Sequence, residues 1–177
     1  MNAEELRSTQ TPLKDRYREA PSSALITLRA KGRLGEGVSC KIETGKALVV
    51  AGLHPATGGT GFAACSGDML LEALAACAGV TLNAVATALN IELRDASIEA
   101  EGELDVRGTL GMSKEVPVGF QNIRLRFTLD TDASEEQLAT LQRLTERYCV
   151  IYQTLAHPPA IAVSRRSVGP RVRANGA

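Results

Sequence analysis

Apolar and polar residues alternate along several short stretches of the chain, and this two-residue period is typical of strands that bury one face. The stretches that predict strands in this way are residues 25–31, 37–43, 46–51, 97–107, 120–130 and 160–168. In the second stretch Val38, Cys40 and Ile42 share one face, while polar residues occupy the other. The KGRLGEG segment between the first two stretches predicts a hairpin connection, because its glycines suit the backbone of tight turns.

Residues 69–89 form a long apolar segment that carries a single charge, Glu72. The segment is long enough to cross a bilayer. Small and polar residues dilute it, basic flanks are missing and strand patterns lie on both sides, so we expect a core helix and no membrane association. We expect Ser66 or Asp68 to cap this helix, and the helix to run to about Asn90. It is expected to be buried almost all round, at the centre of a large core or of a dimer.

A second helix is predicted after the strand that ends near residue 130. Ser134 and Gln137 have the spacing of a capping box, which marks a helix start. Apolar residues at helical spacing continue to about Leu155, and Pro158 and Pro159 then end the helix. The fold class is therefore α+β, with largely antiparallel sheets and two long helices. Residues 1–22 are expected to form a polar N-terminal arm, residues 23–168 a single domain and residues 169–177 a flexible tail.

Length and composition exclude several classes of protein. The chain has 177 residues and 44% apolar residues, enough for one domain with a substantial core. Its 20 basic and 20 acidic residues balance, which argues against nucleic-acid binding, because that needs clustered positive charge. The polar N-terminus shows no secretory signal, so we expect a cytoplasmic protein with reduced cysteines.

The residues alone leave few candidates for chemistry. His54 and His157 each precede a proline in loop-like sequence, and neither belongs to a zinc-ligand module of the usual spacing, so no metal or other cofactor is expected. Cys40 and Cys77 lie on apolar faces, Cys65 precedes a helix and Cys149 lies on the second helix. Without further information, Cys40, Cys77 and Cys149 are best interpreted as packing residues, whereas Cys65, in a loop, is a candidate for an exposed thiol.

Two cysteine motifs change this interpretation. SGDMLLEALAACAGVTL, around Cys77, resembles the first cysteine motif of the OsmC/Ohr family (osmotically inducible protein C and organic hydroperoxide resistance proteins), of the form ELLxAxLAACxxxTL. TERYCVIYQTL, around Cys149, resembles the second motif, of the form YCPVxxTL. The two cysteines lie 72 residues apart with strands between them, as in that family.

The resemblance implies an OsmC-like α+β fold in an intertwined homodimer, and a thiol peroxidase in oxidative stress defence. It makes Cys77 the peroxidatic residue, which an organic hydroperoxide oxidises to a sulfenic acid. Cys149 then forms a disulfide with Cys77, which a dithiol, lipoyl or thioredoxin-type reductant reopens. The family also uses an arginine from a Gly-Arg element in the first hairpin, and Arg33 matches it here.

The sequence also departs from the family pattern. Gly67 stands where the organic hydroperoxide resistance branch has a glutamate that holds the arginine. Asp68, the next residue, either substitutes for that glutamate or, as we favour, caps the helix. Val150 replaces a proline, so we expect the helix to continue past Cys149. These departures keep two alternatives open: a non-enzymatic dimer that binds an apolar small molecule, and a slow redox sensor.

Overall fold

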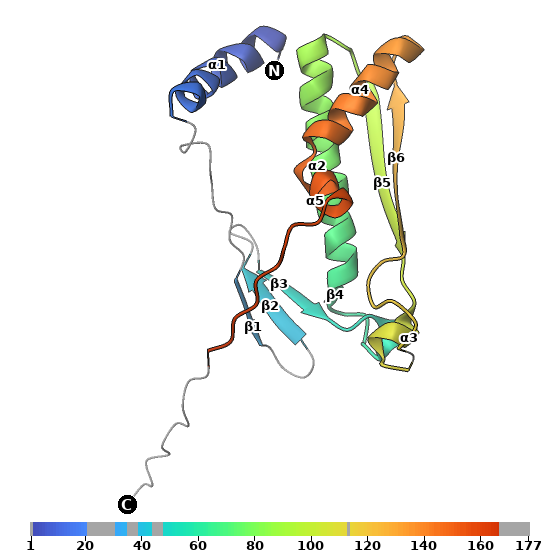
Figure 1. Ribbon diagram of the computed structural model, residues 1–177. Helices are drawn as coiled ribbons and strands as arrows, with labels where there is room; N and C mark the ends of the chain where they lie inside the picture. Colours follow the sequence, from blue (N-terminus) through green and yellow to red (C-terminus); the bar gives the residue numbers. More distant parts are fainter. Residues whose placement is uncertain (1, 21–30, 35–38, 44–47, 113, 167–177) are drawn as a thin grey trace, which may run out of the picture.

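The computed structural model describes residues 2–20, 31–34, 39–43, 48–112 and 114–166. The elements are α1 (Ala3–Glu19), β1 (Lys31–Leu34), β2 (Ser39–Glu43), β3 (Leu48–Gly52), η2 (Pro55–Thr57), β4 (Ala64–Cys65), α2 (Ser66–Leu89), β5 (Asp95–Glu103), α3 (Val106–Thr109), β6 (Asn122–Asp130), α4 (Glu135–Tyr148) and α5 (Val150–Ala156). Figure 1 shows α2 running through the molecule, with the β5–β6 hairpin along one side and α4 and α5 packed against it. Strands β1 to β4 lie near the end where α2 begins.

Within the described residues, the strands form two separate sheets. One has the order β1-β2-β3-β4, in which only the short β3–β4 pair is parallel, and the other is the antiparallel β5–β6 hairpin. The predicted α+β class with largely antiparallel sheets is therefore confirmed.

The β5–β6 hairpin follows the predicted alternation of its residues. Ile98 pairs with Phe127 on the face that packs against α2. Glu99 pairs with Arg126 on the other face, where their side chains form an exposed ion pair at 3.1 Å. Because side chains alternate between the two faces of a strand, this register places the apolar residues in the core and the charged residues outside.

Helix α2 begins without a side-chain cap, contrary to the prediction for Ser66 or Asp68. Its N-cap is Cys65, and Ser66 and Asp68 both lie inside the first turn. The reason is that Cys65 also pairs with Gly52, so β4 leads directly into the helix. The predicted end near Asn90 is confirmed, since that residue caps α2 in the left-handed conformation.

Burial of α2 is confined to one stripe within the single chain. Leu74, Ala78, Leu82 and Ala86 are buried at four-residue spacing, whereas Val80 is 73% exposed. The expectation of a helix buried almost all round is therefore wrong for the isolated chain, because β5, α4 and α5 cover one side. Helix α2 is long and apolar enough to cross a membrane, but core helices of soluble proteins meet the same criterion.

Most of the N-terminal arm forms helix α1. The Glu5 N–H donates to the Asn2 side chain at 2.9 Å, and the Asn2 N–H donates to the Glu5 carboxylate at 3.0 Å. The two hydrogen bonds form a capping box at the start of α1. The helix includes Pro12 in its interior.

The remaining differences concern the ends of strands. β1 occupies residues 31–34, which belong to the segment predicted as a connection, and residues 25–30 lie outside the described part. β5 ends at Glu103, because Asp105 caps the short helix α3. Residues 160–166 form no strand, contrary to the prediction for residues 160–168.

Candidate functional site

Cys77 and Cys149 come together at the centre of the molecule. Cys77 lies half-buried in the middle of α2, and Cys149 is 1% exposed at the junction between α4 and α5. Their thiols are hydrogen-bonded to each other, and α2 packs against both α4 and α5. The structure thus joins the two cysteines that the sequence placed 72 residues apart.

The backbone breaks from helical geometry at Cys149. This residue has φ −72° and ψ 109°, an extended conformation, and is both the C-cap of α4 and the N-cap of α5. The capping box at the start of α4 is confirmed, but the predicted continuous helix to Leu155 is wrong. Val150 does not prevent the break, because helix propensity at one residue is weak compared with tertiary packing.

The surroundings of Cys77 favour its thiolate. Burial alone raises the pKa of a thiol, since it disfavours the charged form. At Cys77 this effect is outweighed by hydrogen bonds from the Ile151 N–H, the Cys149 thiol and the Val150 N–H, so the pKa of Cys77 lies below its ordinary value. The N–H groups of Val150 and Ile151 can donate to Cys77 because the helix is interrupted at Cys149, which leaves them without carbonyl partners in a preceding turn.

Cys149 is shifted in the opposite direction. Burial raises the pKa of Cys149, and the adjacent Cys77 thiolate raises it further by repulsion between like charges. The opposite pKa shifts therefore favour ionisation of Cys77 over Cys149, whose thiol is hydrogen-bonded to Cys77. This is the division of roles that a nucleophilic thiolate and a resolving thiol require.

Of the other predicted site residues, Asp68 lies away from Cys77 along α2. Asp68 is exposed and lies nine residues before Cys77 on the same helix, a rise of about 13 Å. Arg33 lies in β1 opposite Lys41, but its side chain lies outside the described part, as does that of Cys40.

Gly67 lies in the first turn of α2, next to Phe120 and Cys65. A Cβ atom at this position would lie 3.4 Å from Cζ of Phe120 and 3.6 Å from Sγ of Cys65. These are ordinary van der Waals distances, so the space around a Cβ atom does not explain why glycine stands here instead of the family's glutamate.

Cys65 is too far from Cys77 to pair with it within the chain. Twelve residues separate the two along α2, a rise of about 18 Å, whereas a disulfide needs Cα atoms within about 7 Å. Within the described residues, Cys65, Cys77 and Cys149 are all free thiols, and no three potential metal ligands cluster.

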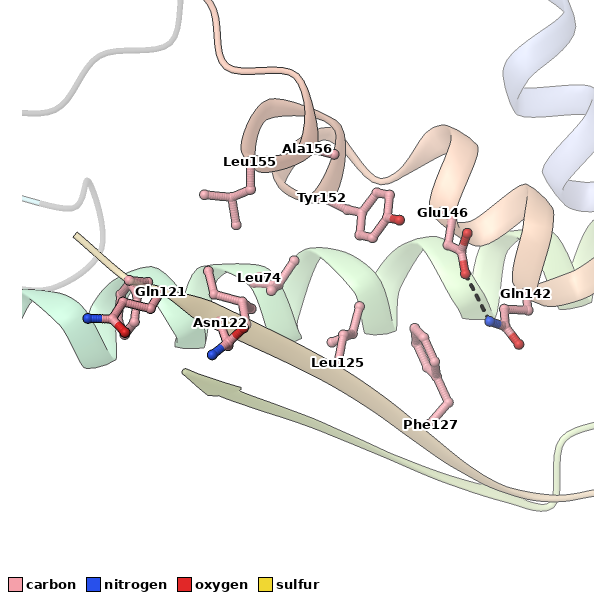
Figure 2. A pocket seen from close by; sticks show the side chains of 12 residues that line it. Leu74, Gln121, Asn122, Leu125, Phe127, Gln142, Glu146, Tyr152, Leu155 and Ala156 are labelled. Carbon is pink, nitrogen blue, oxygen red and sulfur yellow. Dashed lines mark hydrogen bonds between the residues drawn. The ribbon is translucent and has the colours of Figure 1, made fainter. Parts of the chain in front are cut away.

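Two of the cavities that border α2 lie beside β6 or at the start of the helix. One of about 500 Å³ lies between α2, β6 and α5, and Figure 2 shows Leu74, Leu125, Phe127, Tyr152 and Leu155 around it. The other, of about 590 Å³, lies at the start of α2. Its apolar lining residues include Leu53, Leu71, Leu104, Val106, Val118 and Phe120.

The residues that shape the junction could not be recognised in the sequence pattern. Thr145 is 1% exposed, and its carbonyl accepts the Cys149 N–H at 2.9 Å. The side chain of Gln153 donates to the Glu146 carbonyl at 2.8 Å, across the break. Helical spacing gave no signal for Gln153, because a break in the backbone cannot be recognised from the apolar pattern.

The fold and the site define the class of the protein: an α+β protein with a pair of adjacent thiols between a long helix and a helix junction. The family model described as "OsmC-like protein" matches residues 58–164. The chain belongs to this OsmC-like family.

Solved structures show the same fold. An OsmC-like protein from Mycoplasma pneumoniae matches with a TM-score of 0.63 and 20% identity over 75% of this chain and 89% of that one. An organic hydroperoxide resistance protein from Elizabethkingia anophelis matches with a TM-score of 0.61 and 16% identity, over 76% and 91%. One from Legionella pneumophila, also described as a predicted redox protein, has a TM-score of 0.59 and 21% identity, over 75% and 91%. A search of curated proteins finds no relative.

Proposed function

We propose that the protein is a thiol peroxidase that reduces organic hydroperoxides to alcohols. The observation that carries this proposal is the contact between Cys77 and Cys149, with backbone N–H groups that favour the Cys77 thiolate. The names of the structural relatives from Elizabethkingia anophelis and Legionella pneumophila, both organic hydroperoxide resistance proteins, support it.

The reaction proceeds in three balanced steps. The Cys77 thiolate attacks the distal oxygen of ROOH, the O–O bond breaks, and with one proton the products are ROH and the Cys77 sulfenic acid. The Cys149 sulfur then attacks the Cys77 sulfur, which forms the disulfide and releases water. A dithiol, lipoyl or thioredoxin-type reductant supplies two electrons and two protons to restore both thiols.

Arg33 and Asp68 are proposed to complete the site. The guanidinium of Arg33 would orient the peroxide oxygens beside Cys77, and Asp68 would either hold that arginine or, as we favour, act only on the start of α2, whose first turn contains it. Replacing Arg33 with leucine is expected to slow oxidation by cumene hydroperoxide by about tenfold or more. Arg126→Leu is the matched control, because Arg126 pairs with Glu99 on an exposed face. Equal rates in both variants would remove Arg33 from the mechanism.

A homodimer in the cytoplasm is proposed as the working form. The exposed apolar side chains on α2 and the helix junction support it, since single chains rarely leave such a surface uncovered. These side chains are Leu70, Val80, Leu89, Tyr148 and Val150. Sedimentation equilibrium tests this proposal, and a monomer at micromolar concentration would contradict it.

The peroxidase proposal is tested by counting thiols. Reduced protein is treated with one equivalent of cumene hydroperoxide or hydrogen peroxide, and the remaining thiols are titrated. We expect rapid loss of two thiols with the organic peroxide, no loss in Cys77→Ser and over-oxidation of Cys77 in Cys149→Ser. Survival of all four thiols in the folded protein would refute the peroxidase.

A second candidate function is the binding of an apolar small molecule, which the cavity of about 590 Å³ at the start of α2 favours. It predicts that a fluorescent apolar dye binds the reduced protein, and that the thiols survive the titration above. A slow redox sensor would form the same disulfide without sustained turnover in the presence of a dithiol. Following peroxide consumption over many equivalents separates the sensor from the enzyme.

A further inference from the structure

The break at Cys149 leaves an unusual hydrogen-bonding arrangement at the end of α4. In a continuous helix each carbonyl accepts the N–H four residues later, so the Glu146 carbonyl would accept from Val150. Here the side-chain Nε2 of Gln153 donates to the Glu146 carbonyl instead, at 2.8 Å. The N–H of Gln153 itself donates to the Cys149 carbonyl at 2.9 Å, which fixes Gln153 in the first turn of α5.

The Val150 N–H therefore has two competing acceptors. One is the Glu146 carbonyl, which it would meet if the helix closed, and the other is the Cys77 sulfur, which it meets in the open junction. A carbonyl at a helix end that loses its partner carries a free-energy cost, and this cost favours closure of the helix. A second donor on that carbonyl removes the advantage of closure.

We infer that Gln153 is a positioning residue: by occupying the Glu146 carbonyl, it keeps the α4–α5 junction open and the Val150 N–H directed at Cys77. The inference deepens the proposed function, because Gln153 matters for catalysis only if the protein is a peroxidase. The effect on the Cys77 thiol itself concerns the reduced protein and does not depend on that proposal. The side chain of Gln153 donates to a backbone carbonyl, so its proposed effect on Cys77 is transmitted through the backbone. The titratable group that faces Cys77 across the junction is the Cys149 thiol.

The test measures the ionisation of Cys77 by its reactivity. Trypsin releases residues 47–94 as one peptide, which contains Cys65 and Cys77, so a Cys65→Ser background leaves a single thiol in it. Reduced protein is alkylated with iodoacetamide between pH 5 and 10, and the labelled peptide is quantified by mass spectrometry. The thiolate is the reactive form, so the rate rises as the pH passes the pKa of Cys77 and is lost as the pH falls below it.

Gln153→Met is expected to shift this pH profile upwards and to lower the rate at pH 7 by about three- to tenfold, because a rise of one pKa unit reduces the thiolate fraction about tenfold. The rate at high pH should stay unchanged. The matched control is Gln142→Met, since Gln142 donates to the carboxylate of Glu146 at 2.9 Å rather than to its carbonyl. This control should keep the wild-type profile.

Gln153→Asn provides a second variant, because it retains the amide but is one methylene too short to reach the Glu146 carbonyl. We expect it to shift the profile like Gln153→Met. A wild-type profile in a folded Gln153 variant, or an equal shift in Gln142→Met, would overturn the inference. Alkylation uses no peroxide. The pH profile therefore tests the role of Gln153 even if the protein proves not to be a peroxidase.

Discussion

Replacing Leu141 with alanine tests how much the packing of α4 on α2 contributes to the stability of the fold. Leu141 is 0% exposed and forms a core cluster with Leu82, Ala86 and Ile91. Replacing a buried leucine with alanine costs about 3–5 kcal/mol, because the surrounding side chains only partly fill the space. We expect a loss of about 3–4 kcal/mol in the free energy of unfolding, which corresponds to roughly 6–16 °C in Tm for a chain of this size.

The matched control is Leu155→Ala. Leu155 is only half-buried on α5 and borders the cavity of about 500 Å³ shown in Figure 2, so its truncation enlarges an existing space and should cost about 1–2 kcal/mol. Urea unfolding followed by circular dichroism measures both variants at one protein concentration. Equal losses, or a loss below about 1 kcal/mol for Leu141→Ala, would refute the view that the α2–α4 contact is the principal core.

Three further predictions concern positions outside this contact. Cys65→Ser should leave the rate of peroxide-induced disulfide formation within about twofold of wild type, because Cys149 is the thiol in contact with Cys77. A large loss of disulfide on a non-reducing peptide map would contradict this. Gly59→Ala should destabilise the protein by about 2 kcal/mol or more, because the added Cβ would lie 1.7 Å from the Leu53 carbonyl oxygen. A wild-type melting curve would show that this loop does not adopt the described conformation. Ser134→Ala should cost about 1 kcal/mol through loss of the capping box at the start of α4, and unchanged urea unfolding would show that the cap contributes nothing.

Local patterns determined a large part of the fold. The alternation in β5 and β6 was recognisable because side chains of a strand alternate strictly between its faces, and the register then pairs Glu99 with Arg126 outside the core. The start of α4 was recognisable because the capping box of Ser134 and Gln137 involves only neighbouring residues. The resemblance of two short motifs was enough to indicate the family and both cysteines of the candidate site.

Patterns failed where a segment's conformation depends on distant parts of the chain. Residues 160–166 alternate like a strand yet pair with no strand in the described part, since a strand forms only when another edge is available to it. The start of α2 was misjudged for the same reason, because pairing of Cys65 with β3 positions the chain there instead of a side-chain cap.

The sequence by itself thus determined the class of fold, the long apolar helix and the two cysteines, because these depend on residue types at short, regular spacings. Only the tertiary structure decided the break at Cys149, the donation of Gln153 to the Glu146 carbonyl and the orientation of two N–H groups towards Cys77. A helix such as 134–155 has similar local preferences whether it is continuous or broken. Packing of α4 and α5 on α2 supplies the difference in free energy, and that packing joins residues far apart along the chain.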